Sequence, residues 1–470
     1  MNSAYIWIIF PSLVAVILLL LQKRETLVAI LATGTTAVLA GLAAWLPVQE
    51  QIIFWRWVFP FSDTFIIFGR QIVLSAADRP SLIVIYLTAA LWFGAAPLAR
   101  PNRLFVPLGL GMVTLLTAAI AVEPFLFAGV LIEIAVLVSI PFLSPPGSRA
   151  GRGVLRYLSF QTIGMPFILI SGFMFTGFEV GPGNQEFVAI ATALLAIGFA
   201  LLLAVFPFHT WIPMLAEDSH PYPTAFVFLL LPVAVSIFGL GFLDSYVWFK
   251  SNPSTALLLQ LAGVVMVVTA GIWAAVERHI TRLMGFAIIL DIGFSLIAIG
   301  LAIGGNSEIY RVLFYALLLP RGLSLGVWAL ALSGLIGRIE VLDLENIRGL
   351  GRRYPVISIS MILSIFCIAG LPLLAGFPLK LGVIEGLSAT VPQISLWVIM
   401  GSLGLIAGGI RMLISMVSDA DEIRDESPES RTLRAFLVIG LAILFTLGIL
   451  PNFFIQLIIN LLAAFGSVVP

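Results

Sequence analysis

The chain is poor in cysteine and in charge, and each shortage excludes a class of function. Its 470 residues contain one cysteine, Cys367. A lone cysteine cannot form an internal disulfide, hold an iron–sulfur cluster by itself or build a cysteine-rich zinc site. Only 10% of the residues are charged, and 24 Lys and Arg balance 24 Asp and Glu. The chain therefore lacks the basic excess with which nucleic-acid-binding proteins neutralise phosphates, so nucleic acid is excluded as a partner.

The sequence also lacks the common cofactor motifs. It contains no phosphate-binding loop of the GxxxxGK type, no glycine-rich dinucleotide fingerprint after a strand, and no paired histidines suited to two haems. We therefore expect no cofactor and no redox centre in this chain. Its source of energy is then an ion gradient or another chain.

What the chain does contain is apolar residues, which make up 60% of it. Continuous apolar segments without period-two alternation favour helices over an outer-membrane barrel. Since a span needs about 20 apolar residues, we predict an all-α polytopic membrane protein with about 14 transmembrane helices. The predicted spans cover residues 4–22, 26–46, 81–98, 104–121, 123–143, 157–177, 185–206, 223–243, 255–275, 283–303, 308–335, 355–388, 393–416 and 434–466.

The distribution of Lys and Arg predicts the orientation, because short cytoplasmic loops retain basic residues. Sixteen follow odd-numbered spans: Lys23, Arg24, Arg100, Arg103, Arg149, Arg152, Arg156, Arg278, Arg282, Arg338, Arg348, Arg352, Arg353, Arg424, Arg431 and Arg434. Five lie on the other side: Arg56, Arg70, Arg79, Lys250 and Arg311. This asymmetry predicts an integral protein of a bacterial inner membrane with both termini on the outer face.

Two spans read as discontinuous helices. The seventh ends in AVFPFHTWIP, and the twelfth contains AGLPLLAGFPLK. A broken helix at membrane depth is tolerated where it is packed in protein or lines a cavity. The breaks lie five spans apart, which suggests two inverted five-helix repeats, spans 4 to 8 and 9 to 13. The alternative is that each break is simply a tolerated Gly or Pro.

The repeats divide the chain into four predicted parts. Residues 1–103 hold the first three helices, and residues 104–243 form the first repeat. Residues 244–416 form the second repeat, and residues 417–470 hold a cytoplasmic loop and the last helix.

Four ionisable residues lie deep in predicted spans, where each costs at least ~2.5 kcal/mol. Glu133 is about ten residues from either end of its span, or about 15 Å at 1.5 Å per residue, and Asp291 is some eight residues inside the tenth span. Lys380 follows Pro378 in the twelfth span, and Arg321 follows Pro320 in the eleventh. Arg411 is five residues from the end of its span, where its side chain can reach the interface.

Two explanations of these charges stay open. They can form buried ion pairs that fix helix packing, or they can form a proton path. A desolvated lysine loses affinity for its proton and a desolvated carboxylate gains it, so moving such partners together or apart moves a proton.

His209 and His220 flank a loop with Glu217 and Asp218. A metal site there is one interpretation, but the spacing of possible ligands is irregular. A role in proton entry or loop folding is the interpretation that we favour, and we expect no metal.

Three segments resemble the antiporter-like subunits of respiratory complex I and of Mrp-type cation/proton antiporters. They read FPFHTWIPMLAEDSHPYPTAF, RHITRLMGFAIILDIGFSLIAIGL and GLPLLAGFPLKLGVIEGL. The resemblance implies fourteen helices with outer termini, two inverted repeats, and breaks in helices seven and twelve. It also implies that Glu133 corresponds to the glutamate of helix five and Lys380 to the lysine of helix twelve.

The sequence departs from this family at three places. Leu201, Leu202 and Leu203 stand near the place of the helix-seven lysine, and Ser236 is the nearest polar residue to that of the helix-eight lysine. Helix eleven carries Pro320 and Arg321 in place of its usual histidine- and lysine-bearing pattern.

The main hypothesis is a proton-translocating, antiporter-like subunit of an NADH:quinone-oxidoreductase-type complex. Glu133 and Lys380 would be the switching pair or its ends, Asp291 and Arg321 a central relay, and His209 a gate beside the cytoplasmic entrance. Expected partners are other membrane subunits, the lipid bilayer, and protons or Na⁺. The alternatives are a subunit of a Mrp-like Na⁺/H⁺ antiporter or related ion-coupled uptake complex, and a non-pumping scaffold subunit that has lost its lysines.

Overall fold

The protein folds into a bundle of long apolar helices, as seen in a computed structural model. The structure describes residues 3–45, 52–54, 57–59, 64–67, 69–74, 78–147, 150–179, 185–246, 253–304, 307–339, 341–419, 429–452, 455–456 and 459. Arg56, Arg149, Lys250 and Arg424 lie outside these residues.

The described residues contain seventeen α-helices, and nine of these are long and apolar enough to cross a membrane. Their bounds are α1 (Phe10–Leu20, after the π-helical turn Tyr5–Ile9), α2 (Glu25–Trp45), α3 (Arg79–Ala99), α4 (Phe105–Ala121), α5 (Ala128–Leu143), α6 (Arg152–Glu179), α7 (Gln185–Leu202), α8 (Trp211–Asp218), α9 (Pro221–Ser245), α11 (Pro253–Val276), α12 (Ile280–Gly304), α13 (Ser307–Ser333), α14 (Leu350–Arg353), α15 (Pro355–Ala369), α16 (Gly376–Thr390), α17 (Pro392–Val417) and α18 (Arg431–Ile449).

Most predicted spans correspond to one observed helix, and three differ. The segment 355–388 forms two helices, α15 and α16, and the helix is interrupted between Ala369 and Gly376. The helix predicted over 123–143 begins only at Ala128, since the residues before it pair with a strand. The last helix, predicted over 434–466, is α18, which begins at Arg431 and ends at Ile449; residues 460–466 of the prediction lie outside the described residues.

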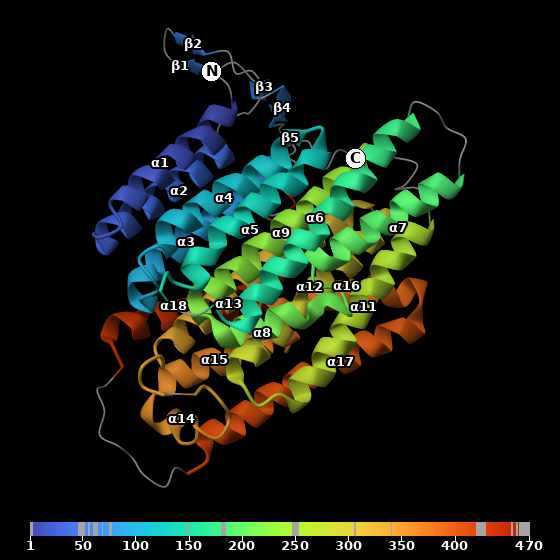
Figure 1. The fold of residues 1–470 in the computed structure, drawn as a ribbon. Helices are drawn as coiled ribbons and strands as arrows, with labels where there is room; N and C mark the ends of the chain where they lie inside the picture. The colour runs from blue at the N-terminus through green and yellow to red at the C-terminus, as the bar shows by residue number, and fades with distance from the viewer. Residues whose placement is uncertain are drawn as a thin grey trace.

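Five short strands, which the sequence analysis did not predict, lie at one end of the bundle (Figure 1). β1 (Ile52–Phe54) pairs with β2 (Trp57–Phe59) in an antiparallel hairpin. β3 (Thr64–Ile67), β4 (Arg70–Val73) and β5 (Val122–Glu123) form an antiparallel sheet, with Ile72 opposite Val122. These segments are rich in β-branched and aromatic residues, which favour strands when they are too short to span the membrane.

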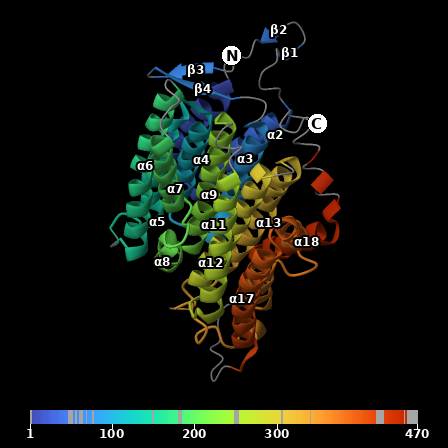
Figure 2. The ribbon, with the colours of Figure 1, turned by 90° about the vertical axis from the view of Figure 1, so that its right-hand side faces the viewer.

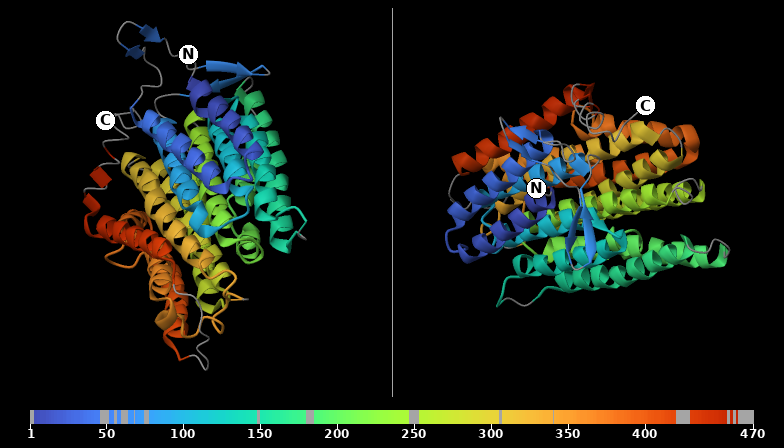
Figure 3. Two further views of the ribbon diagram at one scale, coloured as in Figure 1. Left: turned by 90° about the vertical axis from the view of Figure 1, so that its left-hand side faces the viewer. Right: turned by 90° about the horizontal axis from the view of Figure 1, so that it is seen from above.

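The helices run up and down, and two of them form the centre of the bundle. In the apolar windows of α9 and α12, 89% and 94% of the residues are buried, against 17% for α18. Figures 2 and 3 show α9 and α12 between the side formed by α6 and α7 and the side formed by α15 to α18. Apolar side chains at the periphery, such as Leu20 and Ile414, are exposed. That pattern suits a protein whose outer surface meets hydrocarbon.

Glycines allow close contact between α11 and its neighbours. A Cβ atom on Gly271 of α11 would lie 2.1 Å from the backbone oxygen of Gly401 in α17. A Cβ on Gly263 of α11 would lie 2.5 Å from the backbone oxygen of Gly293 in α12. Small residues at such crossings let membrane helices pack backbone to backbone.

The end of the bundle opposite the strands carries α8, α14 and most of the described arginines, and we call it the arginine-rich end. Ion pairs join its loops: the Arg282 guanidinium lies 2.6 Å from the Glu217 carboxylate. Arg411 donates to the backbone oxygens of Ala275 and Glu277, at 2.7 and 3.0 Å. Its guanidinium therefore satisfies carbonyls at the end of α11, where helix ends leave acceptors free.

Candidate functional site

Lys380 is positioned by the break between α15 and α16. Gly370 ends α15 with a positive φ of 85°, a conformation that glycine adopts without strain. A Cβ on Gly376 would lie 2.1 Å from the Cys367 backbone oxygen, so α16 begins directly against the last turn of α15. This contact brings Lys380 to the carbonyl end of α15, where its ammonium donates to the Ile368 carbonyl. A cation at this end is favoured by the helix dipole.

The Lys380 ammonium also meets a carboxylate. Its Nζ atom lies 2.7 Å from Oδ1 of Asp291, which projects from α12. The ring of Phe294, three residues on in α12, lies below the ammonium with its centroid 4.5 Å from Nζ. Carboxylate, carbonyl and aromatic face all stabilise a positive charge at this position.

Arg321 of α13 holds the other side of the same carboxylate. Its Nε donates to Oδ2 of Asp291, and one terminal nitrogen donates to the Asp291 backbone oxygen at 2.9 Å. That nitrogen also donates to the hydroxyl of Ser295, one helical turn beyond Asp291. Asp291, Arg321 and Lys380 are each only 2–3% exposed. We call these three residues the charged cluster.

The charged cluster contains one carboxylate and two groups that can be cationic. Arginine does not lose its proton in proteins, whereas a lysine ammonium can. If Lys380 releases its proton, Asp291 and Arg321 are left as a neutral pair, and if Lys380 is protonated the cluster carries one net positive charge. Because a buried net charge is costly, the protonation state of Lys380 is sensitive to its surroundings.

Glu133 lies apart from this cluster. It is the sixth residue of α5 and half-buried, and its Oε1 atom accepts a hydrogen bond of 2.6 Å from the Thr162 hydroxyl of α6. Its other oxygen is buried and has no hydrogen-bond partner among the described residues. Exposed apolar side chains, among them Leu137 and Ile163, surround this edge of the bundle. Because α5 starts later than predicted, Glu133 lies closer to the strand end than the sequence suggested.

His209 lies in the interruption between α7 and α8. The short 3-10 helix Phe208–Thr210 carries it, and the imidazole stacks on Phe206 with ring centroids 5.6 Å apart. The side chain is buried, and its Nδ1 atom has no hydrogen-bond partner among the described residues. Within the described part of the chain, no group of three or more His, Cys, Asp or Glu could hold a metal ion.

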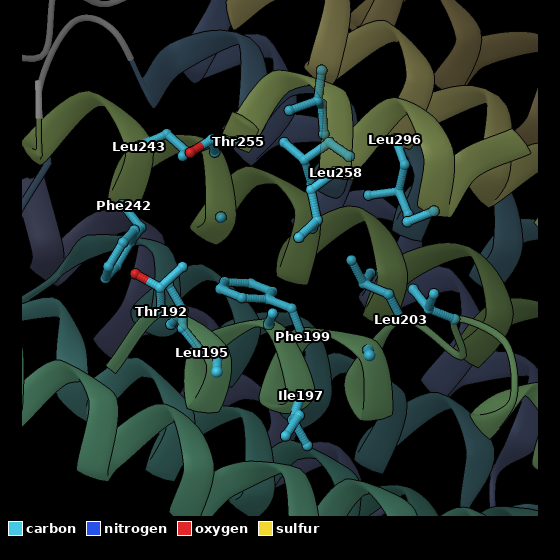
Figure 4. Close-up of a pocket in the computed structure, with 18 of the residues that line it drawn as sticks. Thr192, Leu195, Ile197, Phe199, Leu203, Phe242, Leu243, Thr255, Leu258 and Leu296 are labelled. Atoms are coloured by element: carbon cyan, nitrogen blue, oxygen red, sulfur yellow. The ribbon is translucent and has the colours of Figure 1, made fainter. Parts of the chain in front are cut away.

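An apolar cavity of about 770 Å³ lies next to this interruption (Figure 4). Helices α7, α9, α11 and α12 line it, with side chains such as Phe199, Phe242 and Leu258. Leu203 and Ser236 line the same cavity, and both lie near the places where the resemblance led us to expect lysines. No charged residue is among its described lining residues. The cavity therefore offers no titratable group to a proton.

The uncharged groups that contact the charged cluster were not predicted from the sequence. Phe294 and Ser295 could have been found, because they lie three and four residues after Asp291 and so share its helix face. The Ile368 carbonyl could not have been found, since its availability depends on where α15 ends. Thr162, the partner of Glu133, comes from a different helix and leaves no local signal.

Fold and site together define a polytopic membrane protein whose interrupted helices enclose ionisable groups. A family model described as "NADH:quinone oxidoreductase/Mrp antiporter, TM" matches residues 167–407, just over half of the chain. The chain belongs to this family.

Curated relatives carry the name NADH-quinone oxidoreductase subunit N. The protein from Rhodococcus opacus is 27% identical over 285 residues, which cover 58% of this chain and 50% of the relative. The protein from Thioalkalivibrio sulfidiphilus is 24% identical over 438 residues, 85% of both chains. The match thus spans about half the length of the first relative and most of the second.

Solved structures share the fold. A chain of the Mrp complex from Dietzia sp. aligns with a TM-score of 0.80 and 17% identity, covering 99% of this chain and 98% of that chain. A chain of respiratory complex I from Thermus thermophilus aligns with a TM-score of 0.74 and 18% identity, covering 97% and 98%.

Proposed function

We propose that the protein is a proton-translocating, antiporter-like membrane subunit of an NADH:quinone-oxidoreductase-type respiratory complex. The observation that carries this proposal is the charged cluster, in which one acid faces two basic groups and all three side chains are almost completely buried. Lys380 is the member that can bind and release a proton at modest cost, because the Asp291–Arg321 pair left behind is neutral.

In this mechanism, Asp291 alternates between one and two cationic partners. A proton arriving at neutral Lys380 converts it to the ammonium, which Asp291 and the Ile368 carbonyl stabilise. A shift of α16 relative to α12 would weaken that contact and release the proton. The break between α15 and α16 is the place where such a shift needs the least rearrangement of helix hydrogen bonds.

The proposal includes a topology of fourteen spans with two inverted repeats, residues 104–243 and 244–416. The paired interruptions α7–α8 and α15–α16 support it. Residues 1–103 then supply three helices and residues 417–470 the last loop and helix. The arginine-rich end would face the cytoplasm of a bacterial cell, and both termini would lie outside.

Glu133 and His209 have subsidiary roles in this proposal. Glu133 lies on an apolar edge of the bundle, which a neighbouring membrane subunit would cover, so it can exchange a proton across that contact. His209 would act as a gate near the cytoplasmic side. The structures that share this fold belong to multi-subunit complexes, which supports other membrane subunits as partners.

The test replaces Lys380 with methionine in the assembled complex. Lys380→Met removes the proton carrier but leaves the neutral Asp291–Arg321 pair, so we expect normal assembly and loss of the proton translocation assigned to this subunit. Lys23→Met, which changes an exposed lysine between α1 and α2, is the control and should translocate normally. Unchanged proton translocation per electron in Lys380→Met would contradict the proposal.

A second candidate is a subunit of a Mrp-like Na⁺/H⁺ antiporter, favoured by the TM-score of 0.80 to the Mrp complex chain. Purification with its neighbours separates the two. Flavin and iron–sulfur absorbance in the purified complex supports the respiratory assignment, and Na⁺-dependent proton movement without either chromophore supports the antiporter.

A third candidate is a non-pumping scaffold subunit, favoured by the uncharged lining of the cavity beside α7. A complex in which Lys380→Met pumps normally while deletion of the chain prevents assembly would support this candidate.

A further inference from the structure

The face of α15 that packs against α13 carries buried polar atoms without partners. Ser360 and Ser364 are 0% exposed, and neither hydroxyl has a hydrogen-bond partner among the described residues. The indole nitrogen of Trp328 in α13 is likewise fully buried and without a described partner. Leaving such a group unsatisfied costs roughly 1–3 kcal/mol, and folded proteins normally satisfy it with protein or ordered water.

The two serines share one side of α15 with Cys367. At about 100° per residue, Ser360, Ser364 and Cys367 fall within an arc of roughly 60°. Contacts at both ends show that this side faces α13. A Cβ on Gly334, the residue directly after α13, would lie 3.2 Å from the Ile357 side chain near the arginine-rich end. Near the charged cluster, the Cys367 thiol faces the Ser324 hydroxyl of α13. Ser358 is also buried and its hydroxyl also has no described partner, but it points roughly 160° away from Ser360, toward the side that packs on α17.

The spacing of the two hydroxyls along α15 suits a bridging water better than a direct hydrogen bond. Four residues of helix advance the chain by about 6 Å, which is too far for a direct hydrogen bond but suits two bonds through one water. From Ile357 to Ile368, whose carbonyl binds Lys380, the helix rises by about 16 Å. Ser360 and Ser364 divide this distance into segments, each of which one or two hydrogen-bonded waters can bridge.

A carboxylate lies at the outer end of this face. Glu429, whose side chain is 2% exposed, accepts a hydrogen bond of 3.2 Å from the backbone N–H of Ile357 in the first turn of α15. Its other oxygen lies 3.3 Å from the guanidinium of Arg434, which is half-exposed to solvent. Glu429 thus stands between the solvent at the arginine-rich end and the first serine.

We propose that a hydrated path runs along this face of α15, from Glu429 past Ser360 and Ser364 to Lys380, and delivers protons to the charged cluster from the arginine-rich end. The proposal rests on the proposed function of Lys380 as a proton carrier. Each serine accepts a hydrogen bond from one water and donates to the next, so that an excess proton entering at Glu429 leaves as the third hydrogen of the Lys380 ammonium. No bond other than O–H and N–H changes along the way.

The path also gives protons a route that does not use the uncharged cavity beside α7. The described lining of that cavity contains no charged residue and so supplies no side-chain relay toward the charged cluster. A separate entrance within α13 and α15 lets the second half of the molecule take up protons by itself.

The path is tested by measuring proton translocation in paired variants of the assembled complex, reconstituted in vesicles. Ser360→Val and Ser364→Val remove the hydroxyls and fill the space of the waters, and we expect proton translocation to slow by roughly tenfold or more. Ser364→Thr keeps a hydroxyl and should restore most of the rate. The control is Ser358→Val, a buried serine on the opposite face of the same helix whose hydroxyl also has no described partner, and it should translocate normally because that face lies off the path.

Cys367 offers a second readout that does not depend on transport, because it lies at the inner end of the path. Hydrogen peroxide, a probe little larger than water, converts the thiol to a sulfenic acid with release of water. Mass spectrometry of the Cys367 peptide gives the rate. We expect equal rates in the unmodified complex and in Ser358→Val, and a rate several-fold lower in Ser364→Val.

The two readouts separate the failure of the path from the failure of the function. If Lys380→Met stops translocation while both valine variants pump normally, the path is overturned and the function stands. If Cys367 oxidises as fast in Ser364→Val as in Ser358→Val, the path is likewise overturned. If Ser364→Val slows oxidation while Lys380→Met pumps normally, the wet path stands and the proton carrier is wrong.

Discussion

At the scale of single residues, the charged cluster is held together by one carboxylate. Asp291 is the acid that both Arg321 and Lys380 contact, and all three side chains are almost completely buried. Removing one partner of a buried ion pair leaves the remaining charged group buried, and no opposite charge then offsets its cost of desolvation. Asp291 is therefore the position at which the stability of the fold and the chemistry of the site are most closely linked.

We expect Asp291→Asn to destabilise the protein by about 3–5 kcal/mol, because it leaves the buried Arg321 guanidinium, and Lys380 whenever it is protonated, facing a neutral amide. The matched control is Asp244→Asn, which alters the ion pair with Arg311 at 2.8 Å, where both side chains are partly exposed. Such pairs contribute about 0–1 kcal/mol. Thermal unfolding in detergent compares the two, and equal melting temperatures would contradict the expected difference.

We predict that His220, at the arginine-rich end, makes the stability of the fold depend on pH. It precedes α9, and its Nδ1 atom accepts a hydrogen bond of 3.3 Å from the Tyr222 N–H. Burial lowers its pKa from 6.5 to about 4, although a contact with the Ala99 backbone acts in the other direction. The folded protein therefore favours the neutral imidazole, so this contribution to stability is complete above about pH 6.5 and is lost as the pH falls towards 4.

His220→Asn tests this prediction. Asparagine can accept the same hydrogen bond at the start of α9 but does not titrate. We expect the melting temperature of the unmodified protein to fall more steeply between pH 7 and pH 5 than that of the variant, with little difference above pH 7. Parallel curves over the whole range would show that His220 does not carry this effect.

The sequence identified the charged residues of the site but not their arrangement. Lys380, Asp291 and Arg321 were evident because a charge inside an apolar span is conspicuous. Their meeting at one carboxylate depends on how α12, α13 and α16 pack, and no short-range pattern encodes that. The sequence suggested Glu133 as the counterpart of Lys380, and the structure places Asp291 there while Glu133 contacts Thr162.

At the scale of helices and strands, Gly and Pro predicted the interruptions well. Both expected breaks are present, between α7 and α8 and between α15 and α16. The strands were not predicted, because segments of two to four residues are too short for a reliable periodicity. Close helix crossings were not predicted either, since a glycine in a membrane helix does not indicate by itself which helix packs against it.

The crossing of α11 and α17 gives a prediction at this scale. In Gly271→Ala the new methyl group would lie 2.1 Å from the Gly401 backbone oxygen, so the two helices must separate. We expect a loss of about 1–3 kcal/mol, seen as a lower melting temperature. Gly34→Ala in α2 is the control, because no atom lies within 4 Å of its added Cβ. That change should leave stability equal or raise it by about 0.5–1 kcal/mol.

At the scale of the whole molecule, the two ends of the bundle differ in charge and in structure. One end carries the strands, and the arginine-rich end carries α8, α14 and the arginines of several loops (Figure 1). The helices between them are apolar over their length. Such an asymmetry orients a membrane protein, because basic loops are retained in the cytoplasm.

Labelling of introduced cysteines tests this orientation. Arg348→Cys places a thiol in the exposed loop before α14, and Gln71→Cys places one on an exposed position of β4. In intact cells, a thiol reagent that cannot cross membranes should modify Gln71→Cys and leave Arg348→Cys unmodified until the membrane is opened. The unaltered chain, whose one cysteine is buried, gives the background.

The result also decides what the α15 face would do for the cell. With the arginine-rich end inside, a path from Glu429 to Lys380 takes protons from the cytoplasm, which is the side from which a respiratory pump must remove them. The reverse labelling pattern would place Glu429 outside, and the same path would then release protons or admit them down their gradient. Because the charged cluster has no preferred direction of its own, orientation in the membrane determines which of these two processes the path can serve.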